Sequence, residues 1–127
     1  MPKRNRTKSR FSDMFHLAVS AHTNNWSNDR CEQEQEDLLA KNEDLLDERA
    51  KNTARSEFRV MADPKLSGLL PKIQALTEQV MDAEPPGTSR RFQHEFLNIC
   101  RKVLKFGVGA VAQEVEQRLK GKQLYLK

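Results

Sequence analysis

Apolar residues in the C-terminal third of the chain recur at intervals of three and four, which is the spacing of one face of an α-helix. The first row consists of Phe92, Phe96, Ile99, Val103, Phe106 and Ala110. A second row beside it consists of Leu97, Cys100, Leu104, Val108, Val111 and Val115. This pattern predicts one continuous helix over about 89–120, started by Thr88 or Ser89 as the capping residue. Its broad apolar face should contact two neighbours, either two helices of its own chain or one of them and a second copy.

The same spacing predicts three further helices before this one. They cover about 12–22, 29–62 and 65–83. The helix over 29–62 should be long, acidic and amphipathic, with Asp29 and Glu32 in the capping-box pattern at its start. Its narrow apolar seam, in which Leu38 and Leu45 are seven residues apart, is typical of a short coiled coil.

A short linker of Pro85, Pro86 and Gly87 separates the last two predicted helices. Such a short connection makes them antiparallel neighbours in an αα-hairpin. The predicted fold class is therefore all-α: a small helical bundle built on a C-terminal αα-hairpin plus the long acidic helix, with a disordered basic N-terminal arm.

Composition limits the chain to one domain with a modest core. It has 127 residues, of which 37% are hydrophobic and 31% charged. Residues 1–10 have no apolar periodicity and are predicted to form the disordered arm, and residues 11–127 a single helical domain. The sequence has no run of 18 apolar residues and no apolar segment typical of a signal peptide. We therefore expect no transmembrane segment and an intracellular location, in the cytoplasm or the nucleus.

The net charge of +4 conceals a strong segregation along the chain. Residues 1–10 contain five bases and no acid, residues 11–88 contain 8 bases and 15 acids, and residues 89–127 contain 9 bases and 3 acids. Positive ends of this kind indicate binding to nucleic acid or another polyanion. The alternative is that the acidic middle neutralises the basic end, within one chain or across a dimer.

One polar stripe of the last predicted helix carries cationic and hydrogen-bonding groups. His94, Asn98, Arg101 and Lys105 follow helical spacing. With the arm and the neighbouring bases, the predicted phosphate-binding residues are Lys3, Arg4, Arg6, Lys8, Arg10, Arg90, Arg91, Asn98, Arg101, Lys102 and Lys105. The alternative is an ordinary solvated helix face.

Small residues interrupt the same helix. Each glycine costs about 1 kcal/mol in helix propensity relative to alanine, so we expect either close approach of another backbone or a kink at Gly107. The residues predicted to contact a second copy are Leu38, Leu45, Phe106, Gly107, Gly109 and Val111.

No catalytic pattern is present in the sequence. It lacks a glycine-rich phosphate loop, G-x-S-x-G and H-E-x-x-H, and its three histidines are not spaced as metal ligands. Cys31 and Cys100 are far apart and are predicted to be reduced thiols. We therefore predict a protein that is not an enzyme, with no catalytic residue, metal or cofactor.

Residues 70–105 resemble the helical hairpin of the small double-stranded-RNA-binding proteins of insect nodaviruses. The similarity rests on Leu70-Pro71, Ile73-Gln74, Met81, Arg90-Arg91, Cys100, Arg101, Lys102 and Lys105. It covers about a third of the chain. It implies that such a hairpin can dimerise and lay basic helices along duplex RNA, which is bound by shape and phosphate contacts.

The predicted function is that of a dimeric helical nucleic-acid-binding protein, which contacts the phosphates of duplex RNA or DNA with little base readout. The alternative is a protein-interaction or assembly module, such as an adaptor, scaffold or effector, whose amphipathic helices bind partner proteins.

Overall fold

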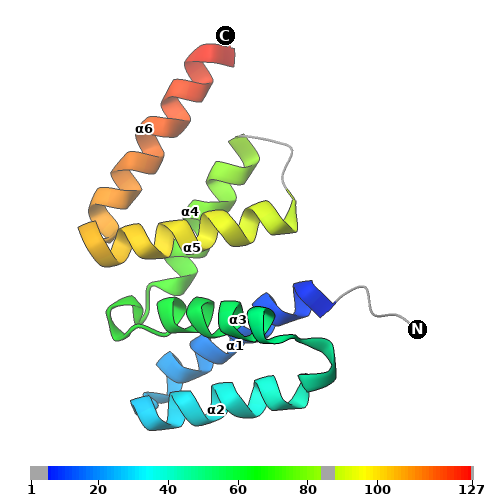
Figure 1. The fold of residues 1–127 in the computed structure, drawn as a ribbon. Helices are drawn as coiled ribbons and strands as arrows, with labels where there is room; N and C mark the ends of the chain where they lie inside the picture. Colours follow the sequence, from blue (N-terminus) through cyan, green and yellow to red (C-terminus); the bar gives the residue numbers. More distant parts are fainter. Residues whose placement is uncertain (1–5, 84–87, 127) are drawn as a thin grey trace. The chain divides into compact units, whose positions relative to one another are not determined.

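The structure is a computed structural model that describes residues 6–83 and 88–126, with side chains for 11–83 and 88–121. In these ranges the secondary structure is helical, and none of it is strand (Figure 1), so the all-α class is confirmed. The chain divides into two compact units, Met1–Ser67 and Gly68–Lys127. The single domain predicted for 11–127 stays a prediction, and each unit is described by itself.

Unit 1 is a three-helix arrangement in which α1 packs mainly on α3 while α2 contacts both. Its elements are α1 (Arg6–Asn24), α2 (Asn28–Lys41), the 3-10 helix η1 (Glu43–Leu45), α3 (Glu48–Met61) and the 3-10 helix η2 (Pro64–Leu66). The predicted arm is wrong in its second half, because α1 begins at Arg6. Its first half, residues 1–5, lies outside the described residues.

The core of unit 1 comes from one face of each helix. Its buried apolar residues are Phe11, Met14, Ala18, Ala21, Leu39, Ala54, Phe58, Met61 and Leu66. A hydrogen bond joins the ends of α1 and α3, in which Nε2 of His22 donates to the carbonyl oxygen of Met61 at 2.9 Å. Burial of this apolar surface holds together helices that are individually polar.

The long helix predicted over 29–62 is wrong, because the chain leaves helical geometry between α2 and α3. Asn42 ends α2 with φ −110° and ψ 22°, and its side-chain amide donates to the Leu38 carbonyl. Asp47 is extended, and its carboxylate accepts the Ala50 N–H at 2.8 Å, which starts α3. Short polar side chains that bond to nearby backbone favour helix ends over helix interiors.

The predicted start of this segment is also corrected. Ser27, rather than Asp29, caps α2, because its hydroxyl accepts the Arg30 N–H at 3.1 Å. Asp29 lies in the first turn instead, where its negative charge suits the helix dipole.

A fork-shaped ion pair joins α2 to α3 after the break. Nε and Nη2 of Arg55 donate to the two carboxylate oxygens of Glu36 at 2.9 and 3.0 Å. These hydrogen bonds lower the pKa of Glu36 below its ordinary value of 4.5. Two parallel charge-assisted bonds fix the orientation of one helix on the other.

Unit 2 consists of α4 (Leu70–Ala83), α5 (Ser89–Phe106) and α6 (Val108–Leu126). The helix predicted over 65–83 begins later than expected, at Leu70, and Pro71 lies in its first turn, where its missing N–H is tolerated. Thr88 caps α5, as one of the two predicted options, and accepts the Arg91 N–H at 3.0 Å.

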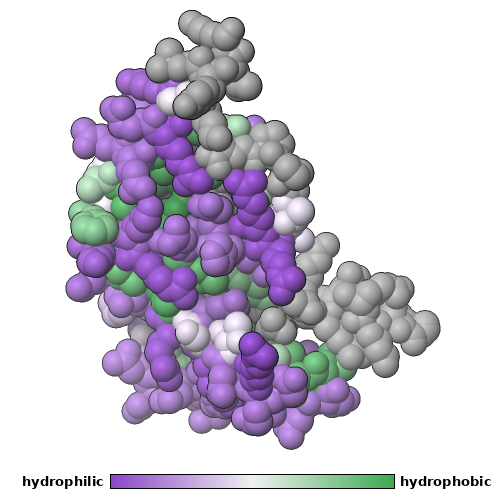
Figure 2. Space-filling model, turned by 45° about the horizontal axis from the view of Figure 1, so that its top comes forward, coloured by the Kyte–Doolittle hydropathy of each residue, from purple (hydrophilic) through white to green (hydrophobic). Residues whose placement is uncertain are grey.

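The three helices of unit 2 share one core, because α4, α5 and α6 all contact each other. The buried residues are Leu70, Ile73, Leu76, Thr77, Val80, Phe96, Leu97, Ile99, Cys100, Val103, Val111 and Val115. The buried Thr77 hydroxyl is satisfied, since it donates to the Ile73 carbonyl at 2.8 Å. Hydrophilic side chains cover most of the face seen in Figure 2, with hydrophobic ones visible between them.

The continuous helix predicted over 89–120 is wrong, because it breaks at Gly107. This residue has φ +92° and ψ 153°, a region that is nearly exclusive to glycine. Its N–H still donates to the Val103 carbonyl at 2.9 Å, which closes the last turn of α5. The chain then turns sharply into α6 (Figure 1), as the alternative of a kink anticipated.

Two ion pairs between α5 and α6 follow from this turn. Nζ of Lys102 lies 2.6 Å from Glu114, and Nη2 of Arg118 lies 3.6 Å from Glu95. Val111 and Val115 of α6 are buried in the core of unit 2. The segment predicted to extend α5 therefore packs beside it instead.

We expect Gly107→Ala to lower the free energy of unfolding by about 1–3 kcal/mol, because a Cβ is strained at this positive φ. Gly109→Ala is the matched control, since Gly109 has no positive φ and an added Cβ meets nothing within 4 Å. The control should be neutral or stabilising by up to about 1 kcal/mol. Urea unfolding followed by circular dichroism measures both, and equal effects would contradict the assignment.

A second prediction concerns pH. A carboxylate whose pKa is lower in the folded state stabilises the fold at pH values above its ordinary pKa. This contribution is lost as the pH falls from the ordinary pKa through the lower pKa of the folded state. Glu36→Gln should therefore have a lower Tm than the unmodified protein at neutral pH, and the difference should shrink as the pH falls below 4.5. Glu43→Gln, at an exposed position in η1, should track the unmodified protein in the same thermal melts. A constant difference for Glu36→Gln would contradict the ion pair.

Candidate functional site

Helix α5 is amphipathic, with a buried apolar face and an exposed polar face. Its buried face is formed by Phe96, Leu97, Ile99, Cys100 and Val103. Its exposed face, called the basic face below, carries Arg90, His94, Asn98, Arg101 and Lys105. At 100° per residue these five positions fall within an arc of about 80°, and at 1.5 Å per residue they span about 22 Å. The predicted stripe is therefore a single exposed strip of one helix.

The basic face contains no acidic residue. The one acid of α5, Glu95, has a side chain that is only 15% exposed and lies beside Arg118 of α6. Within the described part of the chain, Arg90, Arg101 and Lys105 take part in no ion pair. Their charges face water and are available to an anionic ligand.

Two other predicted phosphate-binding residues of α5 are placed differently. Lys102 is half-buried and its ammonium is neutralised by Glu114, so it belongs to the contact with α6. Arg91 is also half-buried. Lys102 is thus neutralised by an acid of its own C-terminal segment, and the alternative in which the acidic middle of the chain neutralises the basic end stays a prediction.

The predicted phosphate-binding residues of the N-terminal segment belong to unit 1. Lys3 and Arg4 lie outside the described residues. Arg6, Lys8 and Arg10 lie in the first two turns of α1, where the structure describes the backbone alone. These cations therefore contribute to the net charge of the chain, and the site described here is built without them.

The residues predicted to contact a second copy are dispersed. Leu38 is half-buried in α2 and Leu45 is exposed in η1. In α6, Val111 is buried in the core of unit 2. Cβ atoms added at Gly107 and Gly109 would meet nothing within 4 Å, so no other backbone in the described ranges approaches them closely. Phe106 is the most exposed of the large apolar side chains in the described residues, at 61%.

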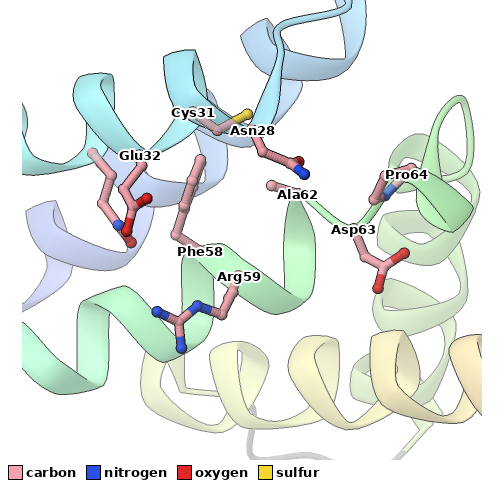
Figure 3. A pocket seen from close by; sticks show the side chains of 9 residues that line it. Asn28, Cys31, Glu32, Phe58, Arg59, Ala62, Asp63 and Pro64 are labelled. Atoms are coloured by element: carbon pink, nitrogen blue, oxygen red, sulfur yellow. The ribbon is translucent and has the colours of Figure 1, made fainter.

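Unit 1 contains a pocket of about 300 Å³ between α2, α3 and the segment that follows α3 (Figure 3). Its lining residues are Asn28, Cys31, Glu32, Gln35, Phe58, Arg59, Ala62, Asp63 and Pro64. Gln35 is 4% exposed, and its Oε1 has no hydrogen-bond partner among the described residues. The pocket is not predictable from the helical pattern of the sequence, which assigns both of its walls to one continuous helix.

The two thiols have different environments. Cys100 is fully buried in unit 2, and burial raises the pKa of its thiol to about 12. Cys31 is half-buried at the edge of the pocket, and partial burial raises its pKa as well. Both are free thiols, which agrees with the prediction.

Three further observations bear on the class of site. Comparison with protein-family models, curated protein sequences and solved structures finds no match to this chain. Within the part of the chain that the structure describes, no group of His, Cys, Asp and Glu could hold a metal ion. No helix in that part has the length and apolar character needed to cross a membrane.

We expect a thiol reagent such as dithiobis(nitrobenzoate) to react with one cysteine of the native protein and with the second only after unfolding. Reaction requires the thiolate, which the buried Cys100 forms too rarely near about pH 8. Cys31→Ser should therefore remove the fast-reacting thiol, whereas Cys100→Ser should leave it. Rapid reaction of Cys31→Ser without denaturant would contradict the burial of Cys100.

Proposed function

We propose that this protein binds the phosphate backbone of nucleic acid through the basic face of α5. The observation that carries the proposal is that three permanent cations, Arg90, Arg101 and Lys105, lie on one exposed strip of the helix. This strip contains no acidic residue, and none of the three cations has an ion-pair partner among the described residues. Phosphate contacts supply most of the sequence-independent affinity of proteins for nucleic acid, because each contact releases condensed counterions.

The dimensions of the basic face suit this role. Arg101 lies 11 residues from Arg90 and four from Lys105, so the cations are separated along the helix by about 16 and 6 Å. Phosphates of one DNA strand follow each other every 3.4 Å or so along the axis, so a strip of this length spans several of them. His94 and Asn98 lie between the cations and can donate hydrogen bonds to phosphate oxygens.

The break at Gly107 limits the length of the proposed binding surface. The surface belongs to the 18 residues of α5 rather than to a helix that continues to residue 120. It also leaves out Lys102 and Arg118, whose charges are engaged between α5 and α6. A helix with three free cations predicts moderate affinity and little sequence preference.

The proposal is tested by the salt dependence of binding. For a fluorescent duplex, log K should fall linearly with log salt concentration, and each lost phosphate contact should reduce the magnitude of the slope by about 1. Arg101→Glu combined with Lys105→Glu should therefore reduce the slope by about 2 and weaken binding roughly 10-fold or more. Helicity should be unchanged, since both side chains are exposed.

The matched control is Lys41→Glu combined with Arg49→Glu. It makes the same change in net charge at two exposed positions of unit 1. It should keep the slope of the unmodified protein within experimental error. Equal losses in both double variants would show that net charge, rather than the basic face, determines binding. A duplex affinity that does not depend on salt would contradict binding through phosphate contacts.

A further inference from the structure

The ring of Phe106 is exposed at a position where the periodicity of α5 requires burial. It follows Ile99 by seven residues and Val103 by three, which places it on the same helix face. Those two residues are 3% and 5% exposed, whereas Phe106 is 61% exposed. The apolar face of α5 therefore extends past the part that α4 and α6 cover.

Gly107 is the reason for this exposure. The turn at Gly107 ends α5 directly after Phe106 and sends the chain away into α6. The first residues of α6 leave most of the ring uncovered, since Phe106 stays 61% exposed and Gly109 and Ala110 are themselves exposed. The aromatic side chain thus stands at the corner between the two helices.

The ring also lies beside Lys105, the last cation of the basic face. The ammonium of Lys105 is 5.5 Å from the ring centroid, within the range of a cation–π contact. An ammonium covers one face of a benzene ring, and the exposed fraction of 61% leaves much of the remaining surface in water. A cation and an open aromatic surface are therefore adjacent at one end of the strip formed by Arg90, Arg101 and Lys105.

We propose that Phe106 is a stacking site for an unpaired nucleobase, at the end of a strand whose phosphates follow the basic face of α5. This inference rests on the proposed function and specifies its ligand as single-stranded nucleic acid or a single-stranded end. Sites for single strands combine a cationic track along the backbone with aromatic side chains on which bases stack. Stacking tolerates any sequence, because every base has a π-face.

A duplex would use the site differently. Its bases are already stacked on each other, and their faces are not available to a protein ring. The phosphates of a duplex can still contact Arg101 and Lys105. Phe106 should therefore distinguish single strands from duplexes, while the cations bind both.

The test compares a fluorescent oligonucleotide of about 15 nucleotides with its blunt duplex, using the full-length protein. Phe106→Ala should weaken binding of the single strand about 5- to 150-fold, which corresponds to one stacked base, and should change binding of the duplex less than about twofold. Phe106→Leu keeps an apolar side chain without a π-system and should lose most of the same affinity. Because Phe106 is largely exposed, neither change should impair folding, and circular dichroism verifies this.

A fluorescence measurement detects the contact between the base and the ring directly. Trp26 is the one tryptophan of the chain, so Trp26→Phe combined with Phe106→Trp places a single reporter at the site. Its fluorescence should be quenched when the single strand binds, and the affinity should equal that of Trp26→Phe alone or exceed it.

Three results would overturn the inference. The first is an unchanged affinity for the single strand in Phe106→Ala. The second is an equal loss for single strand and duplex. The third is a lower mass in solution for Phe106→Ala, which would show that the ring meets a second copy of the chain. Binding that depends on Arg101 and Lys105 but not on Phe106 would overturn this inference alone, whereas no dependence on those cations would overturn the proposed function.

Discussion

The backbone conformation of Gly107 determines what the C-terminal half of the chain can present to a ligand. Its positive φ ends α5 at Phe106 and directs the next 19 residues into α6, which packs on α4 and α5. Without this turn the two apolar rows would continue along one rod and would need a surface far longer than α4 to cover them. With it, Val111 and Val115 close the core from a second direction. One glycine thus converts a long amphipathic segment into a three-helix unit.

The same turn divides the basic residues into two groups. Lys102 and Arg118 lie where α5 and α6 meet, and carboxylates of the opposite helix neutralise them. Arg90, Arg101 and Lys105 are exposed, and none of them takes part in an ion pair among the described residues. A charge count along the sequence treats these residues alike. Only the second group remains available for phosphate, which is why the proposed site is smaller than the C-terminal charge suggests.

Much of the fold could be predicted because periodicity reports burial directly. The residues Ile73, Leu76, Val80, Phe96 and Val103 all have the 3-4 spacing of a helix face, and all are buried. The helix ends were harder, because they depend on single side chains that compete with the helix. Asp47 before Glu48, and Gly107 after Lys105, are the signals that mark a helix start and a helix end. In both places the apolar spacing continues across the signal, so the sequence pattern predicted one helix where the structure has two.

The cations of the candidate site could be predicted from the sequence, but which neighbouring residues belong to the site could not. Helical spacing alone brings Arg90, Arg101 and Lys105 to one face, and the structure keeps them there. The pairing of Lys102 with Glu114, the exposure of Phe106 and the pocket beside Gln35 all depend on where a helix turns back. Such features arise from tertiary contacts, which local pattern does not encode.

The most direct test of the central claim is a nuclear magnetic resonance titration of the full-length protein with a short duplex. The side-chain Nε–H signals of arginine report contacts with phosphate individually. Binding through the basic face of α5 predicts that the signals of Arg90 and Arg101 shift, while that of Arg55, which is held by Glu36, stays in place. Shifts confined to α2 and α3, with no change along α5, would contradict the account.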